Sequence, residues 1–461
     1  MRMLARRLLL PGLTTLALTA TGCSTATPTG AAAPTPATAP SPAADGAQRL
    51  EVAAAPQGAP APTAVGRAGA GRGAPTKSSL KVASYDRQTR RAVISDTRQA
   101  PSAPGHSPAP APPVAVGDVV ASAPAPGAPD GLLAKVTEVG RKTSLGTEVQ
   151  TAPTTLSAVL DADKADGRVP VDPASVTVEP LMKGVTFSWA RSQGARFGPQ
   201  GATLPLGSLR LDVTAPVDTA PDAPVQAAAS VSGFVQLAPT VEFSYDGSGG
   251  SGPRSAFLGM SGVWSSQWSL KGRAAASTGA PRRIPFAKLH SAPVIQVGPV
   301  PVVVDLDLTV YVQVEADGRV TLDVRQDVKG DFRVGGAYAT GPGWTPVSTS
   351  NVHSTPVTSE VTAAGRIKGA LGAEASVGLY GAVGVSADFA PYLRGEADAK
   401  ASAATGGAAS AHAAWALYGG FGLSGQLHAQ LSLFGTPVFE RRIPLGALTR
   451  EWPLVSGRTK S

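Results

Sequence analysis

The sequence has few of the residues that disulfides, metal sites and aromatic cores require. Its 461 residues include one cysteine and five histidines, and 5% are aromatic. A single cysteine excludes an intramolecular disulfide and a cysteine-based zinc cluster. The scattered histidines give no metal-ligand spacing, and no Gly-x-Ser-x-Gly or His-Glu-x-x-His motif is present. We therefore expect no metal, no cofactor and no catalytic residues, and predict a protein that is not an enzyme.

Positive charge is in excess, and glycine and proline are abundant. The chain has 40 Lys and Arg against 32 Asp and Glu, a formal net charge of +8, with 53 glycines and 42 prolines. Such a charge favours anionic partners such as phosphate-bearing wall polymers and acidic lipid head groups; the plain alternative is solubility. Because proline-rich stretches do not pack into a core, the folded part is expected to be shorter than the chain.

The first residues have the pattern of an export signal. Arg2, Arg6 and Arg7 precede the apolar stretch 8–18, which is too short to span a bilayer permanently. The run that follows is Ala20-Thr21-Gly22-Cys23. Arg6-Arg7 also suits twin-arginine export, so the export route stays open.

Small residues directly before a cysteine resemble the lipobox of bacterial lipoproteins, although Ala20 stands where leucine is usual. The resemblance implies that residues 1–22 are a signal peptide and that Cys23 becomes the N-terminus. It also implies that Cys23 carries a diacylglyceryl group and fatty acyl chains such as palmitate. Two or three acyl chains hold a protein stably on a membrane. We therefore expect an extracytoplasmic protein, lipid-anchored to the cell membrane through Cys23, with no nucleic acid partner.

Composition divides the remaining chain into a tether and two β-rich parts. Residues 23–76 are mostly Ala, Pro, Thr and Gly and predict a disordered tether. Residues 77–182 contain short β-rich runs bounded by turn residues, with a helix of about two turns at 154–161, and predict a small, mostly β domain. Residues 183–461 predict a large antiparallel β body.

The fold prediction for the large body is based on the alternation of apolar and polar residues with a period of two. From Val302 to Val314 every second residue is apolar, and Asp317-Gly318 then has the pattern of a type I′ turn, so we predict a hairpin there. Similar alternation runs through 361–389 and 411–433, which are longer than usual strands. The sequence therefore predicts an all-β fold, with either an antiparallel β-sandwich or an elongated β-tube of long alternating strands.

A pair of similar segments and several turn motifs lie in the predicted large β body. Residues 281–289 resemble 440–448 at an offset of 159 (441 − 282), which suggests an internal duplication or a coincidence in a chain rich in Ala and Pro. Four runs are similar to those of a broad set of uncharacterised bacterial secreted all-β proteins: Gly298-Pro299-Val300-Pro301-Val302-Val303-Val304, Gly341-Pro342-Gly343-Trp344-Thr345-Pro346-Val347, Leu379-Tyr380-Gly381 and Trp415-Ala416-Leu417-Tyr418-Gly419-Gly420. That resemblance implies a fold and no particular activity.

Candidate binding residues are four arginines and two tryptophans. Arg282, Arg283, Arg441 and Arg442 stand in pairs before Ile-Pro steps. Together they would form a basic patch for an anionic wall polymer or glycan, and locally paired surface arginines are the alternative. Trp264 and Trp268 share the parity of apolar neighbours, which indicates core or groove lining; the alternative is a glycan-stacking platform.

These features predict a non-catalytic lipoprotein with a binding or structural role at the cell envelope. A second function stays open, because the small apolar faces of 361–389 and 411–433 would suit a β-tube cavity that carries a lipid or small apolar ligand. Asp305 and Asp307 lie two apart on one strand face. We expect them to form a charged solvent face rather than an acid pair or calcium site.

Overall fold

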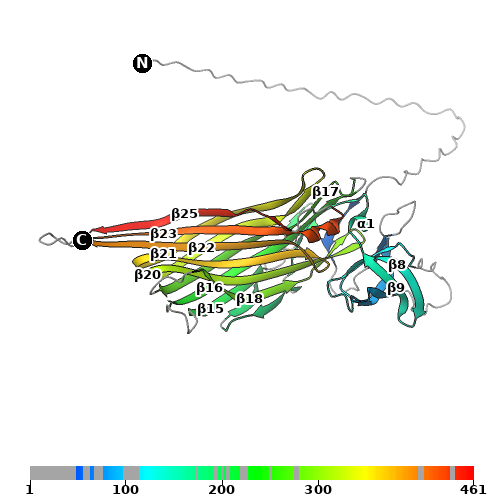
Figure 1. Cartoon of the computed structure of the whole chain (residues 1–461), viewed down its shortest axis with the longest axis horizontal. Coiled ribbons are helices and arrows are strands. Elements are labelled where there is room, and N and C mark those ends of the chain that lie inside the picture. Colours follow the sequence, from blue (N-terminus) through cyan, green and yellow to red (C-terminus); the bar gives the residue numbers. More distant parts are fainter. Residues whose placement is uncertain are drawn as a thin grey trace, which may run out of the picture. The chain divides into compact units, whose positions relative to one another are not determined.

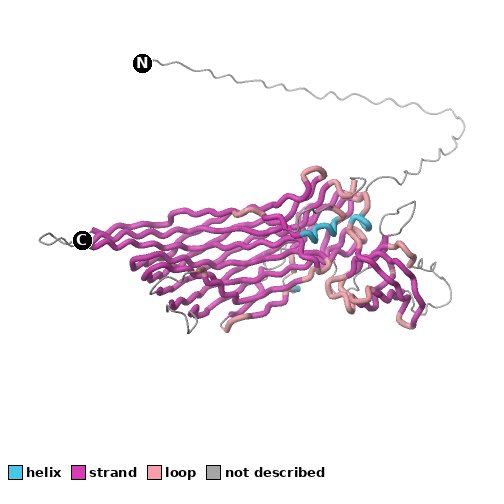
Figure 2. The backbone as a smooth tube through the Cα atoms, in the orientation of Figure 1, coloured by secondary structure: helices cyan, strands magenta, loops and turns pink. Residues whose placement is uncertain are grey.

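The structure is a computed structural model that describes residues 48–55, 63–66, 76–96, 114–172, 175–183, 185–190, 196–198, 201–203, 208–218, 227–248, 252–274, 280–402, 410–436 and 442–460. Almost all regular structure in these ranges is β-strand, as Figure 1 and Figure 2 show. The named helical segments are α1 (Ser157–Leu160) and the 3-10 helix η2 (Ala429–Phe434). None of the described helices has the length and apolar character needed to cross a membrane. The predicted all-β class is confirmed.

A seven-stranded antiparallel sheet forms the first part of the described chain, in the order β4-β3-β7-β8-β9-β6-β5. Its strands are β3 (Thr63–Gly66), β4 (Thr76–Ser78), β5 (Leu80–Asp86), β6 (Arg91–Asp96), β7 (Val119–Ser122), β8 (Leu132–Thr143) and β9 (Gly146–Pro153). The sheet corresponds to the small β domain predicted for 77–182, with different limits. It begins at Thr63 and ends at Pro153, because the next strands pair with the large sheet.

The helix predicted at 154–161 is shorter than expected. α1 makes a single turn and ends at Asp161, whose φ of 46° lies outside the helical region. The backbone N–H of Leu156 donates to the carbonyl of Leu433, 2.7 Å away. This contact fastens the start of α1 to η2.

The predicted limit of the tether, residue 76, lies too far along the chain, because strands are present before it. β1 (Arg49–Leu50) pairs in parallel with β10, β2 (Val52–Ala54) pairs with β19, and all four residues of β3 are buried. These segments are ordered because they pair with strands that are distant in the sequence. Local composition does not reveal such partners. Cys23 and residues 1–22 lie outside the described residues.

A sixteen-stranded sheet forms the large body, with the main order β1-β10-β16-β17-β20-β21-β22-β23-β24. Its remaining members are β10 (Lys164–Pro170), β11 (Thr177–Pro180), β12 (Val185–Ala190), β15 (Ser208–Asp218), β16 (Ala227–Asp246), β17 (Ser255–Ala274), β18 (Arg282–Ser291), β19 (Val294–Val297), β20 (Val300–Ala339), β21 (Gly343–Leu379), β22 (Ala382–Ser402), β23 (Ser410–His428), β24 (Arg442–Pro444) and β25 (Leu448–Lys460). β13 (Arg196–Gly198) and β14 (Gly201–Thr203) pair separately. Apart from the β1–β10 pair, the pairing in the large sheet is antiparallel, as predicted.

The hairpin predicted at Asp317-Gly318 is wrong. β20 is 40 residues long; it continues through this point and pairs with β21 on both sides of it. A hairpin here would place Val314 opposite Thr321 and Val312 opposite Asp323, which mixes apolar and polar residues on each face. In the uninterrupted strand, the even-numbered Val310, Val312, Val314 and Val328 belong to one buried cluster.

The β20–β21 ribbon instead folds over so that its two halves lie in different layers. Val312 from the first half of β20 and Val328 from the second half belong to one buried cluster, although the two halves pair with other strands and not with each other. Gly318 and Gly365 are paired between these halves. Glycine in a strand interior commonly marks such a bend.

Folding of the ribbon creates a β-sandwich. β18, β22, β23 and β25 extend the layer that contains the first half of β20, whereas β17, β16 and β15 extend the layer that contains its second half. Trp264 of β17 and Phe389 of β22 lie three strands apart in the sheet, yet their ring centroids are 5.2 Å apart across the core. The described strands do not close into a tube, so the sandwich alternative holds.

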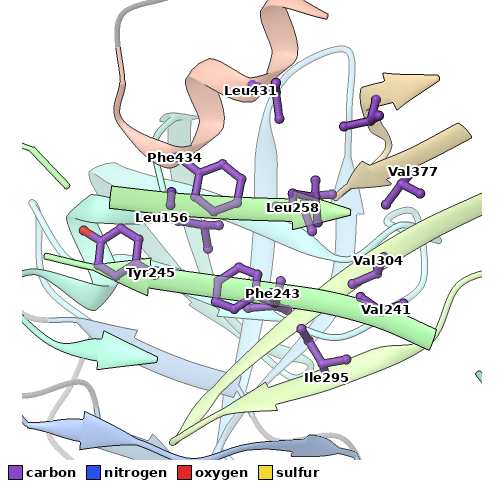
Figure 3. Packing of buried hydrophobic residues seen from close by; sticks show 14 of the residues in the cluster. Leu156, Val241, Phe243, Tyr245, Leu258, Ile295, Val304, Val377, Leu431 and Phe434 are labelled. Carbon is purple, nitrogen blue, oxygen red and sulfur yellow. The ribbon is translucent and has the colours of Figure 1, made fainter. Parts of the chain in front are cut away.

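η2 covers one end of the core. Phe434 stacks on Phe243 with a centroid separation of 5.8 Å, and the Trp344 ring meets Phe434 edge-on at 5.5 Å. Figure 3 shows Phe434 directed toward the strands that carry Leu258 and Phe243. These large apolar contacts close one end of the space between the layers.

The pairing gives no support to the internal duplication. β18, which contains most of 281–289, is a ten-residue strand between β11 and β20. β24, within 440–448, is a three-residue strand paired with β23. The two similar segments therefore have different lengths and neighbours.

Candidate functional site

The inward faces of the two layers enclose apolar space. A cavity of about 80 Å³ lies between them, with a second space of about 50 Å³ that shares four lining residues with it. The shared residues are Leu209, Leu237, Met260 and Leu308. One water molecule needs roughly 10–15 Å³ by the same measure, so the larger cavity accommodates several waters or part of an acyl chain.

Small side chains on one layer explain why the interior is not filled. Ala373, Ala375 and Ala387 line the larger cavity from β21 and β22, facing larger side chains such as Met260 and Phe332 on the other layer. Protein interiors normally pack without voids larger than a water molecule. The small apolar face of 361–389, which suggested a ligand cavity in the sequence, therefore lies at an apolar space between the layers.

Two fully buried polar atoms, on residues that line the cavity, have no hydrogen-bond partner among the described residues. They are Trp264 Nε1 and Ser266 Oγ, on residues that are 7% and 4% exposed. Trp268, at 2% exposure, packs in the neighbouring core cluster. Both tryptophans are buried, as their parity predicted, and neither forms a surface platform for glycan stacking.

The smaller cavity ends at polar residues. His290 Nδ1 and Asp307 Oδ1 are 2.8 Å apart, and both side chains are more than half exposed. Ser291 is buried beside them, with its hydroxyl 2.9 Å from that of Ser175. This end of the apolar space therefore lies next to solvent.

Asp305 is not the exposed carboxylate that the sequence predicted. It is 9% exposed, and its Oδ2 accepts a hydrogen bond from the backbone N–H of Gly381 at 2.5 Å. Burial raises the pKa of the Asp305 carboxyl, and the nearby Asp130 and Asp307 act in the same direction. Asp307 pairs with His290 instead, so the two aspartates do not act as an acid pair.

Arg283 is held by neighbours on its own sheet. Its guanidinium contacts Glu374 at 2.9 Å and Asp388 at 2.8 Å, and its central carbon lies 3.5 Å from the centroid of the Tyr311 ring. Two carboxylates already compensate its charge. This arrangement matches the local pairing considered as the alternative to a binding patch.

The register also separates the predicted arginine pairs. Ile284, next to Arg283, pairs with Val312 of β20. The successive strand pairs that start at Ile443, next to Arg442, lead to Leu306 of β20. An offset of six residues (312 − 306) and five inter-strand steps place the two sites roughly 30 Å apart. Arg282 and Arg442 are exposed, and Arg441 lies outside the described residues. Among the described arginines, Arg282 and Arg283 therefore lie apart from Arg442 and do not form the predicted single patch with it.

A second charged cluster covers the same outer face. Arg394 binds Glu451 at 2.6 Å and also pairs with Glu396, and its guanidinium lies over the Tyr418 ring. The hydrogen bond from Arg394 lowers the pKa of Glu451. These charges satisfy one another and leave no open anion site at this position.

Neither metal-ligand clusters nor similarity to known proteins points to a further site. The described residues contain no group of three or more His, Cys, Asp or Glu side chains that could hold a metal ion. No protein-family model, curated protein or solved structure matches this chain. The cavity and its surroundings are therefore the candidate functional site.

Proposed function

We propose that this chain is an exported lipoprotein that binds a lipid or another small apolar molecule between the two layers of its sandwich. Acylated Cys23 would hold the protein at the outer surface of the cell membrane, close to such ligands. The role is binding rather than catalysis. The observation that carries the proposal is the interior cavity of about 80 Å³, whose lining residues include no charged side chain.

The energetics of burial support an apolar ligand. Each methylene group moved from water into an apolar site contributes about 0.8 kcal/mol. The cavity wall offers the side chains that such a group needs, including Leu211, Val310, Leu371 and Leu423. A charged ligand group would lose its hydration there without gaining a counter-charge.

The anionic-polymer alternative has weaker support. Arg283 is neutralised by Glu374 and Asp388, and the register keeps Arg442 away from it. What remains in its favour is the net charge of +8. We therefore place the apolar-ligand function first.

Equilibrium binding of Nile red, a neutral apolar dye, tests the proposal. The full chain carrying Cys23→Ser, which lacks the acylated residue, should bind the dye saturably. Ala375→Phe adds bulk inside the cavity and should weaken binding by at least about ten-fold. Val263→Phe adds bulk at a position that is 63% exposed and should leave binding unchanged.

A folded variant is required for that comparison. Thermal unfolding checks each protein, and Ala373→Leu provides a second, smaller filling substitution in the same wall. Binding that is absent from the parent chain, or equal in the Ala375 and Val263 variants, would remove the proposal.

A further inference from the structure

The two apolar spaces inside the sandwich meet at side chains from both layers. Leu209, Leu237 and Met260 lie on β15, β16 and β17 of one layer. Leu308 lies on the opposite layer, in the first half of β20. Each of these residues lines both spaces, so together they form the junction between them.

The two spaces extend from this junction in opposite directions across the strands. On the β20 layer, Leu289 of β18 lines the smaller space, and Ala375 of β21 and Ala387 of β22 line the larger one. Strand pairing places these residues in one row, because Leu289 pairs with Leu308, Leu308 with Ala375, and Ala375 with Ala387. The spaces therefore lie end to end along a line perpendicular to the strands.

The combined length of the row is that of one lipid chain. The larger space reaches Leu423 on β23, four inter-strand steps from β18, which is roughly 19 Å at the usual strand spacing. Two acyl chains laid end to end fill the bilayer core of about 30 Å, so one chain is about 15 Å long. The two spaces together match one such chain, whereas each alone matches about half of it.

Met260 is the side chain at the junction that can move most easily. It is 6% exposed and lines both spaces. Methionine is unbranched and has three rotatable bonds, so it adapts its shape to irregular gaps more readily than leucine does. A change of rotamer at Met260 can therefore widen the junction without moving the backbone.

We infer that the two spaces form a single channel for one unbranched acyl or alkyl chain, with Met260 at the junction setting the chain length that binds. This inference rests on the proposed function and defines the shape of its ligand. Two separate voids, each filled independently, are the competing explanation. In that case a chain longer than one space would gain no affinity from its extra methylene groups.

A series of alcohols that displace Nile red from the full chain carrying Cys23→Ser tests the inference. Each methylene group added inside the channel should tighten binding by up to about four-fold. Dodecanol should therefore bind at least about ten-fold more tightly than octanol, which is long enough for only one space. Butyloctanol, a branched isomer of dodecanol with the same atoms, should bind more weakly than dodecanol because a branched chain does not fit the row.

Substitution of Met260 tests the junction itself. Met260→Phe adds bulk between the spaces, so it should remove the gain from octanol to dodecanol while octanol still binds. Val263→Phe, at a position that is 63% exposed, should keep the parent's dependence on chain length. Met260→Ala widens the junction and should raise the affinity for dodecanol more than the affinity for octanol.

The outcomes separate this inference from the proposed function. The single channel is overturned, while cavity binding stands, if dodecanol binds the parent no more tightly than octanol or butyloctanol, or if Met260→Phe keeps the full gain. Absence of any dye or alcohol binding to the parent overturns both. Thermal unfolding checks each variant, and if Met260→Phe does not fold, an equal effect of Met260→Ala on octanol and dodecanol is the result that overturns the channel.

Discussion

Gly372 lies beneath a tyrosine ring on the outer face of the sandwich, and a single methyl group should displace that ring. A Cβ at this position would lie 2.2 Å from Tyr311 Cζ and 2.4 Å from its hydroxyl oxygen. The ring is held by the Arg283 guanidinium above it and by a hydrogen bond of 2.5 Å from its hydroxyl to Asp388. Gly372→Ala should therefore break both interactions.

The expected loss follows from these contacts. A hydrogen bond to a charged acceptor contributes about 1.5–3 kcal/mol, and a cation–π contact about 0.5–2 kcal/mol. Alanine in place of a strand glycine returns about 0.5–1 kcal/mol. We expect Gly372→Ala to lower the free energy of unfolding by about 2–3 kcal/mol.

Urea unfolding measures this difference, and Gly422→Ala is the matched control. Gly422 lies inside β23, and a Cβ there would meet no atom within 4 Å. This control should change stability by less than about 0.5 kcal/mol. In the Tyr311→Ala background, Gly372→Ala should cost little, because the clash is gone. Equal stability of the two glycine variants would refute the argument.

Three further predictions address the anchor, the domain limit and a buried carboxyl. Cys23→Ser should abolish labelling by a clickable fatty acid and release the protein from membranes; persistent labelling would remove the lipoprotein proposal. Limited proteolysis should leave a compact fragment that begins before Gln48, because β1 and β2 pair with the large sheet, and a fragment beginning near Lys77 would contradict this. Burial raises the pKa of Asp305 in the folded state, so its ionised form destabilises the protein and stability is regained as the pH falls through the folded pKa. Urea unfolding should therefore show that Asp305→Asn is more stable than the parent chain at pH 7 and that this difference disappears near pH 4. A difference in stability that is independent of pH would contradict the raised pKa of Asp305.

Alternation along the sequence predicted the strands and their buried faces. The parity of Trp264 and Trp268 correctly indicated burial, because successive side chains in a strand point to opposite faces. The same parity continues through Asp317-Gly318, and this was the signal against a hairpin there. The turn preference of Asp-Gly is local, whereas the alternating pattern runs over many more residues and determines the pairing.

Positions set by distant pairing were not predictable in the same way. The separation of Arg283 from Arg442 depends on the register of five successive strand pairs, which composition does not encode locally. Similarly, Leu50 is buried because the large sheet supplies a partner strand more than 100 residues away (164 − 49 = 115). Neither feature follows from the residues immediately around it.

The cavity was partly predictable. Small apolar residues at 361–389 suggested space for a ligand, and Ala375 and Ala387 do line it. The opposite wall includes Trp264 and Ser266 of β17. Folding of the ribbon brings β17 across from β22, and the sequence does not indicate this arrangement. Sequence reasoning had no means of pairing those two faces.

Fluorescence quenching by a brominated acyl methyl ester tests most directly whether a ligand occupies the space between the layers. Bromine quenches an indole only at short range, so a bound chain should quench Trp264 in a saturable manner. Trp264→Phe should remove most of the quenching, whereas Trp415→Phe, on a residue outside the cavity lining, should retain it. Quenching that does not saturate, or that is the same in the two variants, would contradict ligand binding in the sandwich interior.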